Sequence, residues 1–136
     1  MSLYSYLQYL KHKFTAKTRH GVHSPYVYAF VEQVLNDYTS FDTPAKYSKF
    51  FGAANVKYLP SAYPKHWSQL VLRELNEAHN DLVIAIPNIH ASQQHDKEWK
   101  NMVAMPEVKL SMDTYEYGLL FFRNEFKEKQ HFKVKG

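Results

Sequence analysis

Cysteine is absent from the 136 residues, which excludes a disulfide framework, a thiolate metal site and a cysteine nucleophile. No apolar run approaches the roughly 18 residues of a membrane span, and the N-terminus lacks the continuous apolar core of a signal peptide. The length suits one domain, and 45% hydrophobic with 22% charged residues is typical of a globular chain. We therefore expect a cytoplasmic protein that folds as a single domain over 1–136.

Glycine is also scarce, because the chain has only four: Gly21, Gly52, Gly118 and Gly136. A nucleotide-like cofactor needs glycines after a first strand, since side chains there would block the tight turn and the close approach of the backbone. No Gly-x-Gly occurs anywhere in the chain. The composition therefore argues against a conventional cofactor loop.

The chain has a net charge of +4, and its two ends are poor in acidic residues. Four basic residues and no acidic one precede Glu32, and from Arg123 onward five basic residues face two acidic ones. Basic ends are compatible with nucleic acid, a phosphate ligand or an anionic membrane surface. Specific nucleic-acid binders usually carry a denser patch, so a solvated surface is the simpler interpretation.

The spacing of apolar residues predicts an α/β fold. Helices are expected over 2–14, 25–37, 65–78 and 93–104, and strands over 82–86, 108–114 and 119–123. Ser92 is the candidate N-cap of the last helix, and the unbroken apolar run over 82–86 is typical of a strand buried on both faces. Pro44, Gly52, Pro60 and Pro64 break any regular pattern over 38–64. This segment is interpreted as an aromatic-rich connection that packs on the domain, with 56–59 as a candidate short strand, and the chain ends in a charged tail. This order predicts a small mixed sheet ending in an antiparallel hairpin and flanked by helices. An N-terminal helical pair over 1–37 precedes the α/β portion over 65–136.

The first predicted helix carries Leu3, Leu7, Leu10 and Phe14 at helical spacing. Such a stripe most often belongs to the core. A small sheet covered by few helices can leave the face exposed, however, and self-association is then the alternative.

Two blocks of sequence resemble one known family. Residues 17–28 read KTRHGVHSPYVY, and residues 84–92 read IAIPNIHAS, followed by YGLLFFR at 117–123 and HFKV at 131–134. These blocks resemble a family of class I SAM-dependent methyltransferase-like proteins common in Bacteroidetes. That family opens with two helices around a His-Gly-x-His-Ser-Pro segment and ends with a late strand, an Ile-His-Trp-Ser segment, a helix and a final hairpin.

The resemblance covers about 16–37 and 82–134, and it implies a Rossmann-like fold with SAM as the family's cofactor. A full-length relative places about a hundred further residues between the blocks, including the glycine-rich turn that holds the cofactor. Pro87-Asn88 stands where the family has acidic residues, and Ala91 replaces its tryptophan. The chain therefore resembles a truncated Rossmann-like remnant of a methyltransferase, without its cofactor half.

Three functional hypotheses follow. The first is a non-catalytic, methyltransferase-like protein that needs no cofactor and acts through self-association or a protein partner. The alternative is a SAM-dependent methyltransferase whose site is completed by another subunit. The third is a basic module that binds nucleic acid or phosphate.

Lys17, Arg19, His20 and His23 form the densest polar cluster of the sequence. These side chains are candidates for an anion site near the N-terminus of the helix that follows Ser24. Capping of that helix explains the same residues more simply.

Asn88 and His90 follow the predicted strand over 82–86, at the position where open α/β sheets hold ligands. His90 is a weak candidate for an acid or base, because no nucleophile or paired carboxylate accompanies it in the sequence. The alternative is a hydrogen-bonded loop residue. Pairing of His20 and His23 with His90 and His95 could in principle bind zinc, but neither pair has a convincing third ligand, so no metal is expected.

Overall fold

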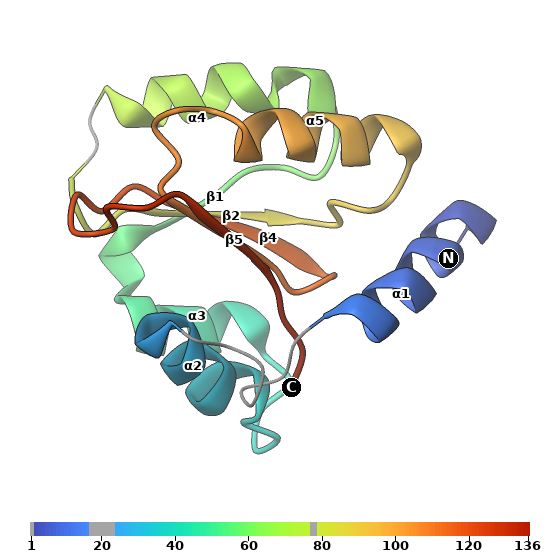
Figure 1. Ribbon diagram of the computed structural model, residues 1–136, viewed down its shortest axis with the longest axis horizontal. Coiled ribbons are helices and arrows are strands. Elements are labelled where there is room, and N and C mark those ends of the chain that lie inside the picture. Colours follow the sequence, from blue (N-terminus) through green and yellow to red (C-terminus); the bar gives the residue numbers. More distant parts are fainter. Residues whose placement is uncertain (1, 17–23, 77–78) are drawn as a thin grey trace.

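The computed structural model describes residues 2–16, 24–76 and 79–136, arranged around one five-stranded sheet (Figure 1). The strands are β1 (Val56–Tyr58), β2 (Val83–Pro87), β3 (Leu110–Asp113), β4 (Tyr117–Phe121) and β5 (Gln130–Lys133). The helices are α1 (Leu3–Thr15), α2 (Pro25–Phe30) with a wider-turn continuation over Val31–Leu35, α3 (Thr43–Phe51), α4 (Trp67–Leu75) and α5 (Gln93–Val103). The predicted α/β class, with a small mixed sheet flanked by helices, is confirmed.

The strands lie in the order β1-β2-β4-β3-β5. β3 and β4 form the predicted antiparallel hairpin, and β4 also pairs antiparallel with β2. The edge strands β1 and β5 pair parallel with β2 and β3, respectively. β2 is therefore an interior strand, and its first four residues are buried, as expected for a strand covered on both faces.

Helices cover both faces of the sheet (Figure 1). Val83 and Ala85 of β2 belong to one core cluster with α2 and α3, whereas Ile84 and Ile86 belong to a second cluster with α4 and α5. Side chains alternate between the two faces along a strand, so this run of apolar residues supplies both cores.

Close packing fixes α5 against the hairpin. Ser92 caps α5 by accepting a hydrogen bond from the His95 amide, as predicted from the sequence. Trp99, in the middle of α5, is buried against Gly118 of β4. A Cβ at Gly118 would lie 2.4 Å from the indole ring, so only glycine admits the tryptophan here.

Two elements differ from the sequence-based expectation. The connection over 38–64 contains α3, which begins at a cap provided by Asp42, and Pro44 lies in its first turn instead of breaking the chain. The region expected to be a charged tail contains β5, which pairs with β3 and brings the buried Val134 to the core. The pairing with β3 stabilises this short strand, whose own sequence has no clear strand pattern.

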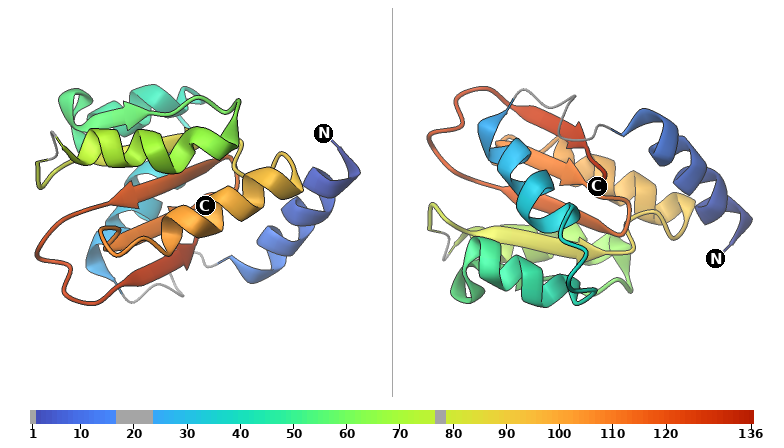
Figure 2. Two further views of the ribbon diagram at one scale, coloured as in Figure 1. Left: turned by 90° about the horizontal axis from the view of Figure 1, so that it is seen from above. Right: turned by 90° about the horizontal axis from the view of Figure 1, so that it is seen from below.

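The two N-terminal helices lie apart: α2 covers one face of the sheet, whereas α1 stands beside it at one end (Figures 1 and 2). The apolar stripe of α1 points outward, with Leu3 75%, Leu7 53% and Phe14 83% exposed. The expectation that this stripe belongs to the core is wrong. The buried residue of α1 is His12 instead.

No helix in the described parts of the chain combines the length and apolarity needed to cross a bilayer.

Candidate functional site

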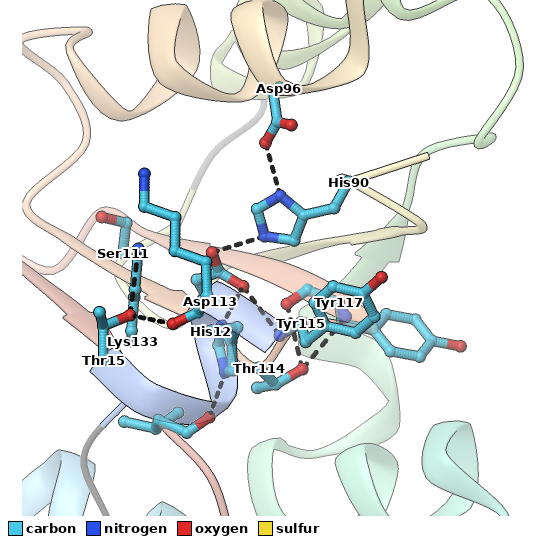
Figure 3. A network of polar contacts seen from close by, with 12 residues as sticks. His12, Thr15, His90, Asp96, Ser111, Asp113, Thr114, Tyr115, Tyr117 and Lys133 are labelled. Atoms are coloured by element: carbon cyan, nitrogen blue, oxygen red, sulfur yellow. Dashed lines mark hydrogen bonds and ion pairs between the residues drawn. The ribbon is translucent and has the colours of Figure 1, made fainter. Parts of the chain in front are cut away.

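A network of buried polar side chains joins α1 to the sheet and to α5 (Figure 3). His90 follows β2, Asp113 ends β3, Asp96 lies in the first turn of α5, and Tyr4 and His12 come from α1. His12, His90, Asp96 and Asp113 are all buried. Residues from widely separated parts of the sequence thus meet at one end of the sheet.

His90 lies between two carboxylates. Its Nδ1 is 2.5 Å from Asp96 Oδ1, and its Nε2 is 2.7 Å from Asp113 Oδ2. Burial by itself lowers the pKa of His90, but hydrogen bonds to Asp113 and Asp96 outweigh burial and raise the pKa from 6.5 to about 9. His90 is therefore an imidazolium that donates from both nitrogens at neutral pH.

The two carboxylates stay ionised. Burial raises the pKa of Asp96 and of Asp113, but the hydrogen bonds from His90 outweigh it, so both pKa values lie below the usual 3.8. Tyr4 donates its hydroxyl hydrogen to Asp96 Oδ2. Burial, together with that bond to a carboxylate, raises the pKa of Tyr4 to about 12. The phenol thus remains a donor throughout the physiological range.

His12 contributes a buried nitrogen that lacks a hydrogen-bond partner. Its Nε2 lies 3.0 Å from the Val134 carbonyl oxygen, which can only accept, so Nε2 carries the proton. Its Nδ1 faces Asp113 Oδ1 at 3.5 Å and forms no hydrogen bond within the described residues. Burial lowers the pKa of His12, although the charge of Asp113 opposes that shift.

The β3–β4 turn supports the network from one side. Tyr115 adopts a left-handed backbone with a φ of 74°, and its amide donates to Asp113 Oδ1 at 2.8 Å. Its ring stacks on His90 with centroids 5.3 Å apart and an interplanar angle of 18°. Its hydroxyl donates to the Ser5 carbonyl oxygen at 2.5 Å, which ties the turn to α1.

His90 lines two cavities. One of about 450 Å³ is also lined by Ser5, Asn88 and Tyr115. The other, of about 390 Å³, is lined by Asp96 and Asp113 and by basic and aromatic side chains: Tyr4, Lys11, Trp99, Lys100, Lys129, His131 and Lys133. The network thus borders two cavities, and His90 lines both.

The arrangement limits the chemistry of His90. Both ring nitrogens donate to carboxylates, so no lone pair is available to a general base while the network is intact. The side chain can hold charge, position its neighbours or exchange a proton for another cation.

The predicted site residues have different outcomes. Asn88 and His90 lie together after β2 as expected, where Asn88 is exposed, has a φ of 58°, and lines the larger cavity with His90. Lys17, Arg19, His20 and His23 lie outside the described residues, so the predicted anion cluster stays a prediction. His95 does not join His90, because its two ring nitrogens contact Ser92 and the Ser61 carbonyl.

Sequence reasoning missed Tyr4, His12, Asp96 and Asp113. One available signal was the i, i+4 spacing of Tyr4, Gln8 and His12, which places polar side chains along one face of α1. A second signal was Asp113, the acidic residue near the end of the predicted strand over 108–114. Neither signal alone identifies the contact, because the partners come from distant segments.

Comparison with protein-family models, with curated proteins and with solved structures found no match to this chain.

Proposed function

We propose that this chain is a methyltransferase-like protein that acts without catalysis, by self-association through the outer face of α1. One observation carries the proposal. α1 is an amphipathic helix that contacts the sheet through polar groups, whereas Leu3, Leu7 and Phe14 of its apolar stripe are exposed and Leu10 is half-buried. Large exposed apolar surfaces of this kind are typical of protein-contact sites.

The spacing of the stripe favours a second copy of the same chain as the occupant. Leu3, Leu7, Leu10 and Phe14 follow a 4-3-4 spacing, which reads the same in both directions. In an antiparallel pair, Leu3 of one copy would lie opposite Phe14 of the other, and Leu7 opposite Leu10. Such a surface is complementary to itself, as a two-fold symmetric contact requires.

Charge also favours the antiparallel arrangement. Lys11 and Lys13 lie in the second half of α1, and the helix has no acidic residue. Antiparallel pairing keeps the lysines of the two copies at opposite ends, whereas parallel pairing would place like charges side by side.

The size of the surface sets the expected affinity. α1 has 13 residues and is therefore about 20 Å long. A contact made by one short helix from each copy lies at the low end of stable interfaces, which start near 1,200 Å² in total. We expect a dissociation constant on the order of micromolar.

The absence of catalysis is supported by the state of His90 and by the scarcity of glycine. His90, the weak catalytic candidate, uses both nitrogens in ion pairs with Asp96 and Asp113. The alternative, a SAM-dependent methyltransferase completed by another subunit, predicts that SAM binds once that subunit is present. Calorimetric titration of the isolated chain with SAM and S-adenosylhomocysteine is expected to give no heat of binding; micromolar binding would favour an enzyme.

The test of self-association is light scattering over a range of protein concentrations, in EDTA so that metal ions cannot contribute. Leu7→Glu places a charge in the centre of the stripe. Leu72→Glu is the matched control, because Leu72 is 49% exposed on α4, a helix that lies apart from α1 (Figures 1 and 2). We expect the wild type and Leu72→Glu to pass from monomer to dimer as concentration rises, while Leu7→Glu stays monomeric.

Two results would contradict the proposal: a wild-type chain that stays monomeric up to millimolar concentration, or a Leu7→Glu variant that dimerises as the control does. Both leucines are half exposed, so neither substitution is expected to change the free energy of unfolding by more than about 0.5 kcal/mol.

A further inference from the structure

We propose that His12, His90 and Asp113 form a binding site for a divalent transition-metal ion, with zinc as the reference ion. One ligand atom from each of these three buried residues lies within 4.8 Å of the other two. The residues come from α1, the segment after β2 and the end of β3, and their side chains converge in Figure 3. The proposal is independent of the function proposed above.

The unpartnered nitrogen of His12 is the first argument. The side chain is only 7% exposed, and its Nδ1 has no hydrogen-bond partner among the residues described. Because the proton of His12 is on Nε2, Nδ1 carries a lone pair, and it faces Asp113 Oδ1 at 3.5 Å. Two electron-rich atoms facing each other in a buried site are stabilised by a cation between them.

Orientation of the ligands is the second argument. His90 is held at Nδ1 by Asp96, which in turn accepts from Tyr4, and this leaves Nε2 as the ligand atom. His12 is held at Nε2 by the Val134 carbonyl, which leaves Nδ1 as its ligand atom. Metal-ligating histidines almost always have their other nitrogen fixed by a carboxylate or a carbonyl in this way.

The spacing of the ligand atoms suits a tetrahedral ion. Zinc bound at about 2.0–2.1 Å places its ligand atoms about 3.3 Å apart. The 3.5 Å between His12 Nδ1 and Asp113 Oδ1 is close to that value. His90 Nε2 lies 2.7 Å from the other oxygen, Asp113 Oδ2, so the carboxylate must turn to offer a single oxygen. The three ligand atoms, which lie within 4.8 Å of one another, must then draw closer around the ion. The ion replaces the proton between His90 and Asp113, so binding releases that proton to solvent.

The donor set indicates the class of ion. Two imidazole nitrogens and one carboxylate oxygen suit zinc and its first-row neighbours, whereas magnesium and calcium prefer oxygen ligands alone. Three protein ligands leave a fourth position open, which is the arrangement of sites that bind an exogenous ligand. His90 and Asp113 line the cavity of about 390 Å³ whose wall includes Lys11, Lys100 and Lys133, so a small anion such as a carboxylate or phosphate suits that position.

The experiment is calorimetric titration of the full chain, free of any histidine tag and pre-treated with EDTA, with zinc chloride. We expect one zinc per chain with micromolar or tighter affinity. Titrations in two buffers that differ in ionisation enthalpy are expected to report release of about one proton per zinc, in line with the deprotonation that metal binding requires. Bound Co²⁺ is expected to show the visible absorption of a four- or five-coordinate ion.

Variants locate the ion. His12→Gln removes a ligand and is expected to lower the zinc affinity by at least about 100-fold, since loss of an outer-shell partner alone costs 10–100-fold. His66→Gln is the matched control, because His66 is an exposed histidine just before α4 and is not one of the three clustered ligands. Tyr4→Phe retains all three ligands and is expected to lower the affinity by about 10-fold, which tests the site even if His12→Gln folds poorly.

The proposal is wrong if the wild type binds no zinc at millimolar concentration. It is also wrong if His12→Gln binds zinc as tightly as the wild type and the control His66→Gln do. Unchanged affinity in Tyr4→Phe would overturn the role assigned to the Asp96 relay. Self-association is measured in EDTA, so failure of either proposal leaves the other standing.

Discussion

Replacing Asp113 with alanine is expected to lower the free energy of unfolding by about 3–5 kcal/mol, the cost of removing one partner from a buried ion pair. The carboxylate side chain is 2% exposed. It accepts from His90 Nε2 at 2.7 Å and from the Tyr115 amide at 2.8 Å. Alanine leaves both donors buried, and each unsatisfied donor costs about 1–3 kcal/mol.

Asp113→Asn is the matched control, because it keeps the size of the side chain. Its amide oxygen can still accept from Tyr115, and its amide nitrogen can donate to His90 Nε2 once that histidine is neutral and donates only to Asp96. All hydrogen bonds thus have partners, and the expected cost is about 1 kcal/mol.

Urea unfolding at pH 7 in EDTA measures both variants without a contribution from metal ions. With a typical slope of about 1–3 kcal/mol per molar, the alanine variant is expected to lose about 2 M in midpoint. Equal costs for the two variants would refute the role of Asp113 as the acceptor that satisfies two buried donors. So would a cost below about 1 kcal/mol for the alanine variant.

The remaining predictions concern pH and packing. In EDTA, the charged state of His90 stabilises the fold, because folding raises the pKa of His90 from 6.5 to about 9. That stabilisation is complete below about pH 6.5 and is lost as the pH rises through 9. The urea midpoint is therefore expected to fall over this interval. A wild-type midpoint that stays flat from pH 6.5 to 9.5 would contradict the raised pKa. Gly118→Ala places a Cβ 2.4 Å from the Trp99 ring and is expected to lower the unfolding free energy by about 1–3 kcal/mol, as seen by tryptophan fluorescence in urea. A cost within about 0.5 kcal/mol of zero would mean that Trp99 can move away from the sheet.

Local signals predicted the strongly patterned elements of the fold. Ser92 before a helical stripe located the start of α5, and the apolar run after Asp81 located the interior strand β2. Both elements follow from their own sequence, since a cap and a doubly buried strand have distinctive patterns.

α3 and β5 were missed because their local patterns are ambiguous. α3 has only nine residues, so its aromatic face of Tyr47, Phe50 and Phe51 covers little more than one turn. Pro44 was interpreted as a break, although proline is favoured in a first turn. β5 has four residues and gains its place from the parallel ladder with β3. Elements of this kind depend on partners distant in the sequence.

The site was only partly predictable, for a related reason. His90 was identified from its position at the carboxyl end of β2. Its acidic partners were not identified, because Asp96 and Asp113 contact His90 only when α5 and the hairpin are packed against the rest of the fold. His12 comes from the opposite end of the chain, and no spacing rule connects it to Asp113.

The polar inner face of α1 explains why its apolar stripe remains outside. Hydrophobic burial has no preferred direction, and a helix docked by Leu3, Leu7 and Phe14 would turn that stripe into the core. α1 is instead held by directional contacts, from His12 to the Val134 carbonyl and from Tyr115 to the Ser5 carbonyl. These bonds fix the rotation of the helix about its axis, so the buried network and the exposed stripe are two consequences of one docking geometry.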